Sequence, residues 1–278
     1  MIKSMPWFRR IIVRRATHGT GKISVGGINQ MFKLESEAGY VDLHDHVETL
    51  IKAELRAELT SFFEQASNDS WAPKLPFTSP KKPATPITPQ LFHPHLEDFT
   101  LFFQVKVVPL TQWNTDLAYQ QAQEILTQAC QMQILLLRNA TSVNQAGIIN
   151  FYQDYIYLRN FVRDQQQKLP KMFDNSAAAE ALFGTQSLKL DERWLSELAS
   201  VVNFLIKGER LDFNSLSDET KASLLNVFEK FKEDKLNLQS LAFDDPEIDE
   251  TVKQMNKLTK DDMKAAKNEI KKHINTNN

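Results

Sequence analysis

The sequence contains a single cysteine, Cys130, among its 278 residues. One cysteine excludes an internal disulfide framework and any zinc site built from clustered cysteines, and it fits a reducing compartment. Long apolar runs are missing as well. The longest candidate, "ILLL" at 134–137, is far shorter than the roughly 18–20 apolar residues that a membrane-spanning helix needs. We therefore expect neither a disulfide-rich secreted protein nor a transmembrane segment.

Acidic residues are absent from residues 1–34, which hold seven Lys and Arg residues. The other 26 Lys and Arg residues stand against all 35 Asp and Glu residues, so the rest of the chain has a net charge of −9. This charge disfavours nucleic-acid binding by the body, because such binding depends on neutralising phosphates. The candidate RNA contacts all lie in the basic arm: Arg9, Arg10, Arg14, Arg15 and Lys22.

The same arm has the composition of a mitochondrial targeting segment, which is rich in arginine, poor in acids and amphipathic. On a helix its apolar residues gather on one side, across from most of the arginines; they are Trp7, Phe8, Ile11 and Ile12. We therefore predict a transit peptide and a mitochondrial matrix protein. An arm that stays attached and contacts ribosomal RNA is the alternative.

Recognised catalytic motifs are also missing. A nucleotide-binding loop reads G-x-x-x-x-G-K-[S/T], but Ala16 stands at its first glycine position and Ile23 follows Lys22. No G-x-S-x-G turn of a hydrolase nucleophile is present. Cys130 lies among apolar residues of a predicted helix, where a thiol is an inert part of the core. We expect a protein without a cofactor that is not an enzyme.

Two His-x-His pairs with neighbouring carboxylates are the candidate metal ligands: His44, His46, His93 and His95. Imidazole and carboxylate together suit zinc or iron. However, side chains two positions apart diverge by about 200° on a helix, which separates His44 from His46. Pro94 interrupts the second pair. We favour exposed polar positions for all four histidines, at a helix entry and at the exit of a linker, and keep a metal-dependent matrix enzyme as an alternative function.

Helical periodicity dominates the chain. Apolar residues recur every three or four positions over residues 41–66 and predict a helix there. Further helices are predicted over residues 115–140, 144–167, 176–183, 191–208, 217–234, 245–258 and 259–274. The predicted N-caps are Asp42, Thr115, Asp191, Ser217, Asp245 and Thr259. Pro170 is predicted to follow the end of the helix at 144–167. Gly208 is predicted to end the helix at 191–208.

Strand periodicity occurs in residues 99–108, where apolar and polar residues largely alternate. Together with short β-like pieces near residues 22–34, this segment predicts a small sheet or hairpin. The predicted fold class is thus mainly α (α+β). Residues 73–94 hold seven of the eleven prolines, which favours an extended polyproline strap. A P-x-x-P ligand for a small recognition domain is the alternative for this strap.

These patterns divide the chain into five regions: a basic targeting segment or arm (1–34), an amphipathic helix region (35–72), a proline-rich strap (73–98), a strand with a helical body (99–243), and polar C-terminal helices with a tail (244–278). They favour a protein that works by contact. We predict a non-catalytic subunit or assembly factor of a mitochondrial multiprotein complex, first of all the mitochondrial ribosome. A soluble bacterial interaction or effector protein is a further alternative.

Overall fold

The computed structural model describes residues 37–67, 71–72, 94–173, 192–234 and 236–276. They belong to two compact units, Met1–Ala57 and Glu58–Asn278. The predicted arm, the β-like pieces near 22–34, most of the proline-rich strap and the predicted helix at 176–183 lie outside the described residues.

Helix α3, Glu37–Ser67, confirms the predicted amphipathic helix of the first half. In the first unit its buried residues recur every four positions: Leu43, Val47, Ile51 and Leu55. The predicted start at Asp42 is wrong, because the helix already begins at Glu37. It passes through Gly39, whose cost of about 1 kcal/mol within a helix does not end a helix of this length.

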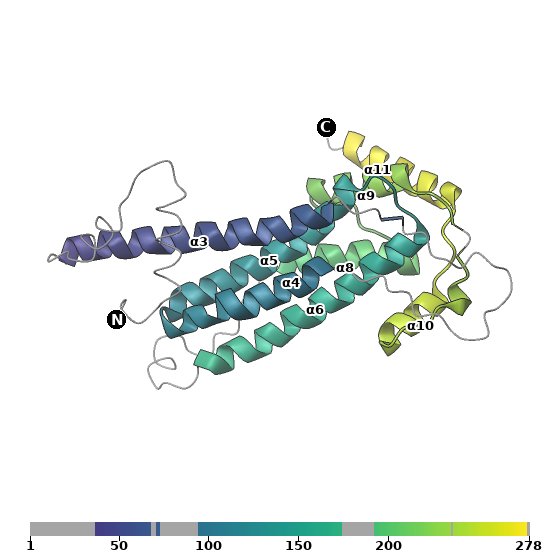
Figure 1. The fold of residues 1–278 in the computed structure, drawn as a ribbon. Helices are drawn as coiled ribbons and strands as arrows, with labels where there is room; N and C mark the ends of the chain where they lie inside the picture. The colour runs from purple at the N-terminus through teal and green to yellow at the C-terminus, as the bar shows by residue number, and fades with distance from the viewer. Residues whose placement is uncertain (1–36, 68–70, 73–93, 174–191, 235, 277–278) are drawn as a thin grey trace. The chain divides into compact units, whose positions relative to one another are not determined.

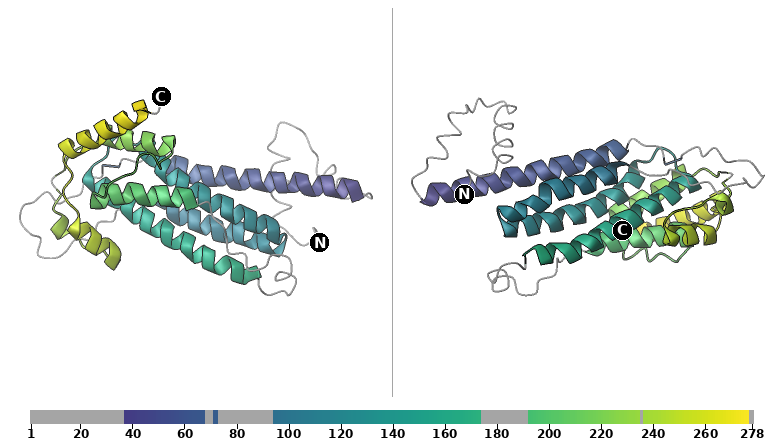
Figure 2. Two further views of the ribbon diagram at one scale, coloured as in Figure 1. Left: turned by 180° about the vertical axis from the view of Figure 1, so that it is seen from behind. Right: turned by 60° about the horizontal axis from the view of Figure 1, so that its bottom comes forward.

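A bundle of four helices forms the body of the second unit (Figures 1 and 2). Its members are α4 (Pro94–Phe102), α5 (Thr115–Asn139), α6 (Gln145–Phe173) and α8 (Glu192–Lys207). Helix α5 packs against α8 and α6, and α6 packs against α4 and α8. Aromatic rings fill the space between α4 and α6, where Phe161 contacts Phe99 at 5.6 Å between ring centroids.

Three further helices of the second unit follow α8: α9 (Asp218–Lys230), α10 (Pro246–Gln254) and α11 (Lys260–Thr276). Helix α9 packs on α5, α11 packs on α9, and α10 contacts α6 and α8. The predicted caps at Ser217 and Asp245 are confirmed, since each side chain accepts a backbone N–H of its helix. Thr259 and Asp262 exchange hydrogen bonds at the start of α11, as predicted. No helix of the described residues is long and apolar enough to cross a membrane.

The predicted strand over residues 99–108 is wrong, because this segment is helical. After α4 the chain continues as a π-helix, η2 (Phe103–Val107), and a 3-10 helix, η3 (Val108–Gln112). Leu96, Phe99, Phe103 and Val107 are buried at intervals of three and four residues, which is a helical stripe. The described part of the chain contains no strand, so its fold is mainly α.

Proline explains the change of helix type in this segment. In an α-helix the ring of Pro109 would clash with the carbonyl group of the residue four positions earlier, Val105. The helix widens at this place, and the N–H group of Val108 bonds to the carbonyl oxygen of Phe103, five positions back. The predicted cap of α5 moves by one residue for a local reason, since the Asn114 side chain accepts the Leu117 N–H at 3.1 Å.

Three chain segments that are distant in sequence meet at Val143. Its N–H donates to the carbonyl oxygen of Lys230 at 3.2 Å, and its own carbonyl accepts the N–H of Lys232 at 2.7 Å. On the other side, the N–H of Asn144 donates to the carbonyl oxygen of Trp71 at 3.0 Å. We call these contacts the Val143 joint. They explain why α9 ends at Lys230 and not at residue 234 as predicted.

Of two further helix ends, that of α8 lies where the sequence predicts it and that of α6 does not. Helix α8 ends before Gly208, as predicted, and this glycine has a φ of 65°, which favours a residue without a Cβ atom. Helix α6 does not end before Pro170 but continues to Phe173. Leu169 and Gln165 are buried on this last part of α6, so packing outweighs the hydrogen bond that proline removes.

Candidate functional site

The predicted metal ligands occupy different surroundings. His44 lies half-buried on α3, with Nδ1 3.8 Å from Asp45 and 3.6 Å from Glu48 of the same helix. His46 is exposed, and His93 lies outside the described residues. No three His, Cys, Asp or Glu side chains in the described ranges come together in a way that could hold a metal ion.

His95 belongs to a buried polar chain that links three helices. Its Nε2 lies 3.1 Å from Oε1 of Gln133 on α5, and Nε2 of Gln133 donates to Asp154 on α6 at 3.2 Å. Because the amide nitrogen of Gln133 faces the carboxylate, its oxygen must accept from His95, so Nε2 of the imidazole carries a proton. All three side chains are buried, so the predicted exposure of His95 is wrong: it lies within α4, where helix packing covers it. These hydrogen bonds therefore join α4, α5 and α6 through buried polar side chains.

Glu197 is a second buried polar group, on α8. Its carboxylate accepts the backbone N–H of Ser217 at 3.2 Å, the Ser217 hydroxyl at 2.6 Å and the Thr220 hydroxyl. Arg193, one turn earlier on α8, lies 3.4 Å away. These donors belong to the start of α9, where a negative charge also complements the helix dipole. Glu197 therefore attaches the start of α9 to α8.

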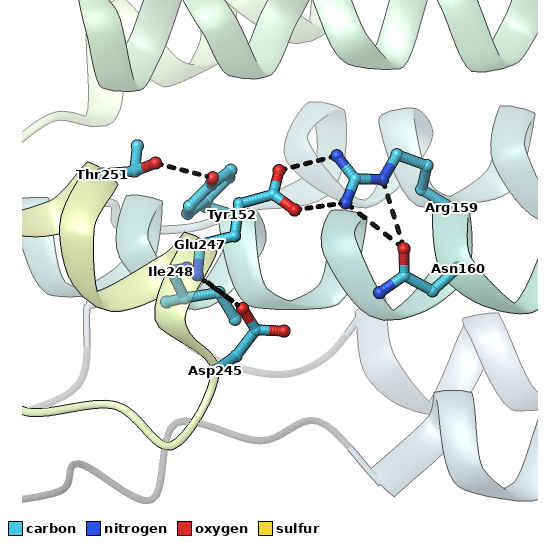
Figure 3. A network of polar contacts seen from close by, with 7 residues as sticks. All are labelled: Tyr152, Arg159, Asn160, Asp245, Glu247, Ile248 and Thr251. Atoms are coloured by element: carbon cyan, nitrogen blue, oxygen red, sulfur yellow. Dashed lines mark hydrogen bonds and ion pairs between the residues drawn. The ribbon is translucent and has the colours of Figure 1, made fainter.

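A polar network holds α10 against α6 (Figure 3). Arg159 of α6 donates two hydrogen bonds to Glu247 of α10, at 2.8 and 2.6 Å. The hydroxyl of Tyr152 donates to Thr251 at 3.1 Å. The bonds from Arg159 hold the pKa of Glu247 below its usual value, and they raise the pKa of Arg159. Burial raises the pKa of Tyr152. This network is a clasp between α6 and α10.

Cys130 lies buried on α5, as predicted. Burial raises the pKa of its thiol to about 12. The reactive form of cysteine is the thiolate, which is therefore nearly absent at neutral pH. Cys130 is unsuited to nucleophilic or redox chemistry.

An exposed apolar surface lies where α4 continues into η2. Leu101 is 60% exposed and Val105 is 57% exposed, and they are the large apolar side chains of the described residues with such exposure. Glu97 and Asp98 lie one turn before Leu101 and are exposed. Positions three or four apart share one side of a helix. We call these four residues the α4 face, and it is the candidate interaction site.

The candidate RNA contacts of the arm, Arg9, Arg10, Arg14, Arg15 and Lys22, lie outside the described residues. No family model, curated protein or solved structure matches this chain. The candidate site thus depends on the geometry of the described residues alone.

Glu197 and the α4 face were not predicted from periodicity, although the sequence contains a signal for each. Glu197 stands three residues after Trp194 and four before Val201, so it is a charged residue within an apolar stripe. Leu101 and Val105 belong to a segment in which apolar residues occupy most positions, more than one buried side of a helix needs. Apolar side chains that lie together at the surface are a signal of a contact site.

Proposed function

We propose that this protein is a non-catalytic subunit or assembly factor of a mitochondrial multiprotein complex, with the mitochondrial ribosome as the first candidate. Its location would follow from the basic arm, and its contacts from the helical body. No observation favours the alternative of a metal-dependent enzyme, since His95 faces Gln133 and no group suited to a metal forms among the described residues.

The observation that carries this proposal is that polar groups within the body bond to other helices. His95 and Glu197 are buried and Arg159 is half-buried, and each of them joins one helix to another. In an enzyme, some polar side chains of the site point toward the substrate. Here the three side chains bond to other helices and so stabilise the fold. The α4 face adds an exposed surface suited to contact, and seven basic residues without an acid in positions 1–34 support mitochondrial import.

The test is sedimentation of the tagged endogenous protein after gentle lysis, with its N-terminus mapped in each fraction. Co-migration with a ribosomal subunit, sensitive to dissociation of that subunit, is the expected result. An intact arm in that fraction would support contact with RNA, and a shortened chain would support a cleaved transit peptide.

A reporter fused to residues 1–34 provides the control for location. Import into mitochondria is expected, and a variant with Arg9, Arg10, Arg14 and Arg15 changed to Gln should remain outside. A light, free peak together with failure of import would overturn the proposal and favour an interaction or effector protein from another setting.

A further inference from the structure

We propose that the α4 face binds a basic amphipathic helix of a partner protein. This inference rests on the proposed function in one respect only, that the protein acts by contact. It does not depend on the mitochondrial location or on the ribosome.

The spacing of the apolar pair indicates the shape of the partner. Leu101 and Val105 are four residues apart, so they form a short apolar ridge along the helix. Such a ridge fits between the side chains of a second helix that repeats its own apolar residues every three or four positions. An extended strand would instead need an open sheet edge, and the described residues contain no sheet.

The other side of this segment is fixed in the core, which makes the face rigid. Phe99 and Phe103 are fully buried, and the ring of Phe103 lies 5.4 Å from that of Phe161 on α6. A surface that does not reorganise loses less entropy on binding. The π-helix adds to this argument, because π-turns are frequent at functional sites. It begins at Phe103, between the two exposed apolar residues.

The charges around the ridge select a basic partner. Glu97 and Asp98 are exposed, and neither side chain forms an ion pair within the described part of the chain. Lys106 is already paired with Glu58 at 3.5 Å. Glu97, Asp98 and Glu58 contribute three negative charges and Lys106 contributes one positive charge. The α4 face and this neighbouring ion pair therefore have a net charge of −2. Such a surface repels RNA phosphates and anionic membranes, and it attracts lysine or arginine.

The test measures binding of a fluorescein-labelled synthetic helix to the full-length protein by fluorescence anisotropy. The probe has about 18 residues, the length that lets an isolated helix form, with leucines along one side and lysines on the other. A second probe carries glutamate at each lysine position. The lysine probe is expected to bind at least about tenfold more tightly than the glutamate probe, with an affinity that falls as salt is added.

Variants identify the surface. Leu101→Ser with Val105→Ser should weaken binding of the lysine probe at least about tenfold, and Glu97→Gln with Asp98→Asn should weaken it about three- to tenfold. Both pairs are exposed, so the fold should be retained, which circular dichroism checks. Asp116→Asn is the matched control, because Asp116 is an exposed acid in the first turn of α5. It should bind as the unchanged protein does.

Each contrary result overturns the inference. Equal binding of both probes would remove the charge argument, and an equal loss in Asp116→Asn would show attraction by overall charge. A dimer that Leu101→Ser with Val105→Ser converts to a monomer would show that a second copy covers the face. If the probes fail to bind while the protein still sediments with a large complex, this inference fails and the proposed function stands.

Discussion

The Cα atom of Gly147 faces the backbone of Trp71 so closely that a Cβ atom built on it would lie 1.8 Å from the Trp71 carbonyl oxygen. Gly147 is in the first turn of α6, and Asn144, which receives its N–H at 2.8 Å, bonds through its own N–H to that same carbonyl. Only glycine allows the start of α6 and the Trp71 segment to approach in this way.

Gly147→Ala should therefore destabilise the protein severely. The new methyl group meets backbone atoms, which cannot turn aside as a side chain does. We expect a loss of about 4 kcal/mol or more in the free energy of unfolding, measured by urea denaturation followed through tryptophan fluorescence. Gly208→Ala is the control. Its Cβ would meet no atom within 4 Å, and its positive φ costs only about 1–2 kcal/mol. Equal losses in both variants would contradict the close approach at Trp71.

Glu197→Ala tests the attachment of α9 to α8. The change removes the carboxylate that accepts the Ser217 N–H and both hydroxyl groups, and leaves the Ser217 and Thr220 hydroxyls only the hydrogen bonds between these two residues. We expect a loss of about 2–4 kcal/mol in the free energy of unfolding. Thermal denaturation followed by circular dichroism measures it. Asp218→Asn changes an exposed acid at the same helix start and should have a much smaller effect. A stable Glu197→Ala protein would show that α9 is held by its apolar contacts alone.

The clasp between Arg159 and Glu247 should contribute to the dependence of stability on pH. The folded protein holds the pKa of Glu247 below its ordinary value of 4.5. The stabilisation is thus fully present above pH 4.5 and is lost as the pH falls through the lower folded pKa. Glu247→Gln should lower stability at pH 7 by about 0.5–1 kcal/mol, a small value because solvent reaches half of the Glu247 side chain and screens the pair.

Urea denaturation at a series of pH values checks this prediction. The difference between the unchanged protein and Glu247→Gln should shrink as the pH is lowered below 4.5. Glu250→Gln on the same helix is the control, since Glu250 is exposed and accepts a hydrogen bond from the neighbouring Gln254 side chain. A difference that stays constant down to the acid transition would show that Glu247 acts through packing and not through its charge.

Cys130 should be unreactive until the protein unfolds. A pKa of about 12 in place of 9.0 lowers the thiolate fraction at pH 8 about a thousandfold, and burial also blocks access. Iodoacetamide labelling followed by mass spectrometry should find no modified Cys130 in the native protein and complete modification in urea. Labelling of the native protein at the rate of a free thiol would show that α5 opens readily at this position.

Sequence periodicity predicted most of the long helices, together with the caps at Ser217, Asp245 and Thr259. These features are local, because a cap joins a side chain to a backbone group two or three residues away. The segment at 99–108 was predicted wrongly because apolar residues occupy most of its positions, so that they match both the alternation of a strand and the three- and four-residue spacing of a helix. Packing of Phe99 and Phe103 against α6 decides in favour of the helix.

The candidate site was harder to predict, because it also depends on packing against distant parts of the chain. Exposure of Leu101 depends on which neighbours cover the segment, and a single sequence contains no such information. The partners of His95 and Glu197 come from other helices, 38 positions away for Gln133 and 20 for Ser217. A charged residue within an apolar stripe, such as Glu197, signals that a buried partner exists but does not identify it.

The Val143 joint sets an order of events during folding. Helices α5 and α6 follow each other in the chain, so they can find each other through a short turn. Val143 gains its partners only when the segments around Trp71 and Phe231 arrive from opposite directions along the sequence, and each arrival closes a long loop at an entropic cost. During synthesis the Trp71 segment has already emerged when Val143 does, whereas the N–H and carbonyl groups of Val143 stay hydrated until Lys230 and Lys232 have followed.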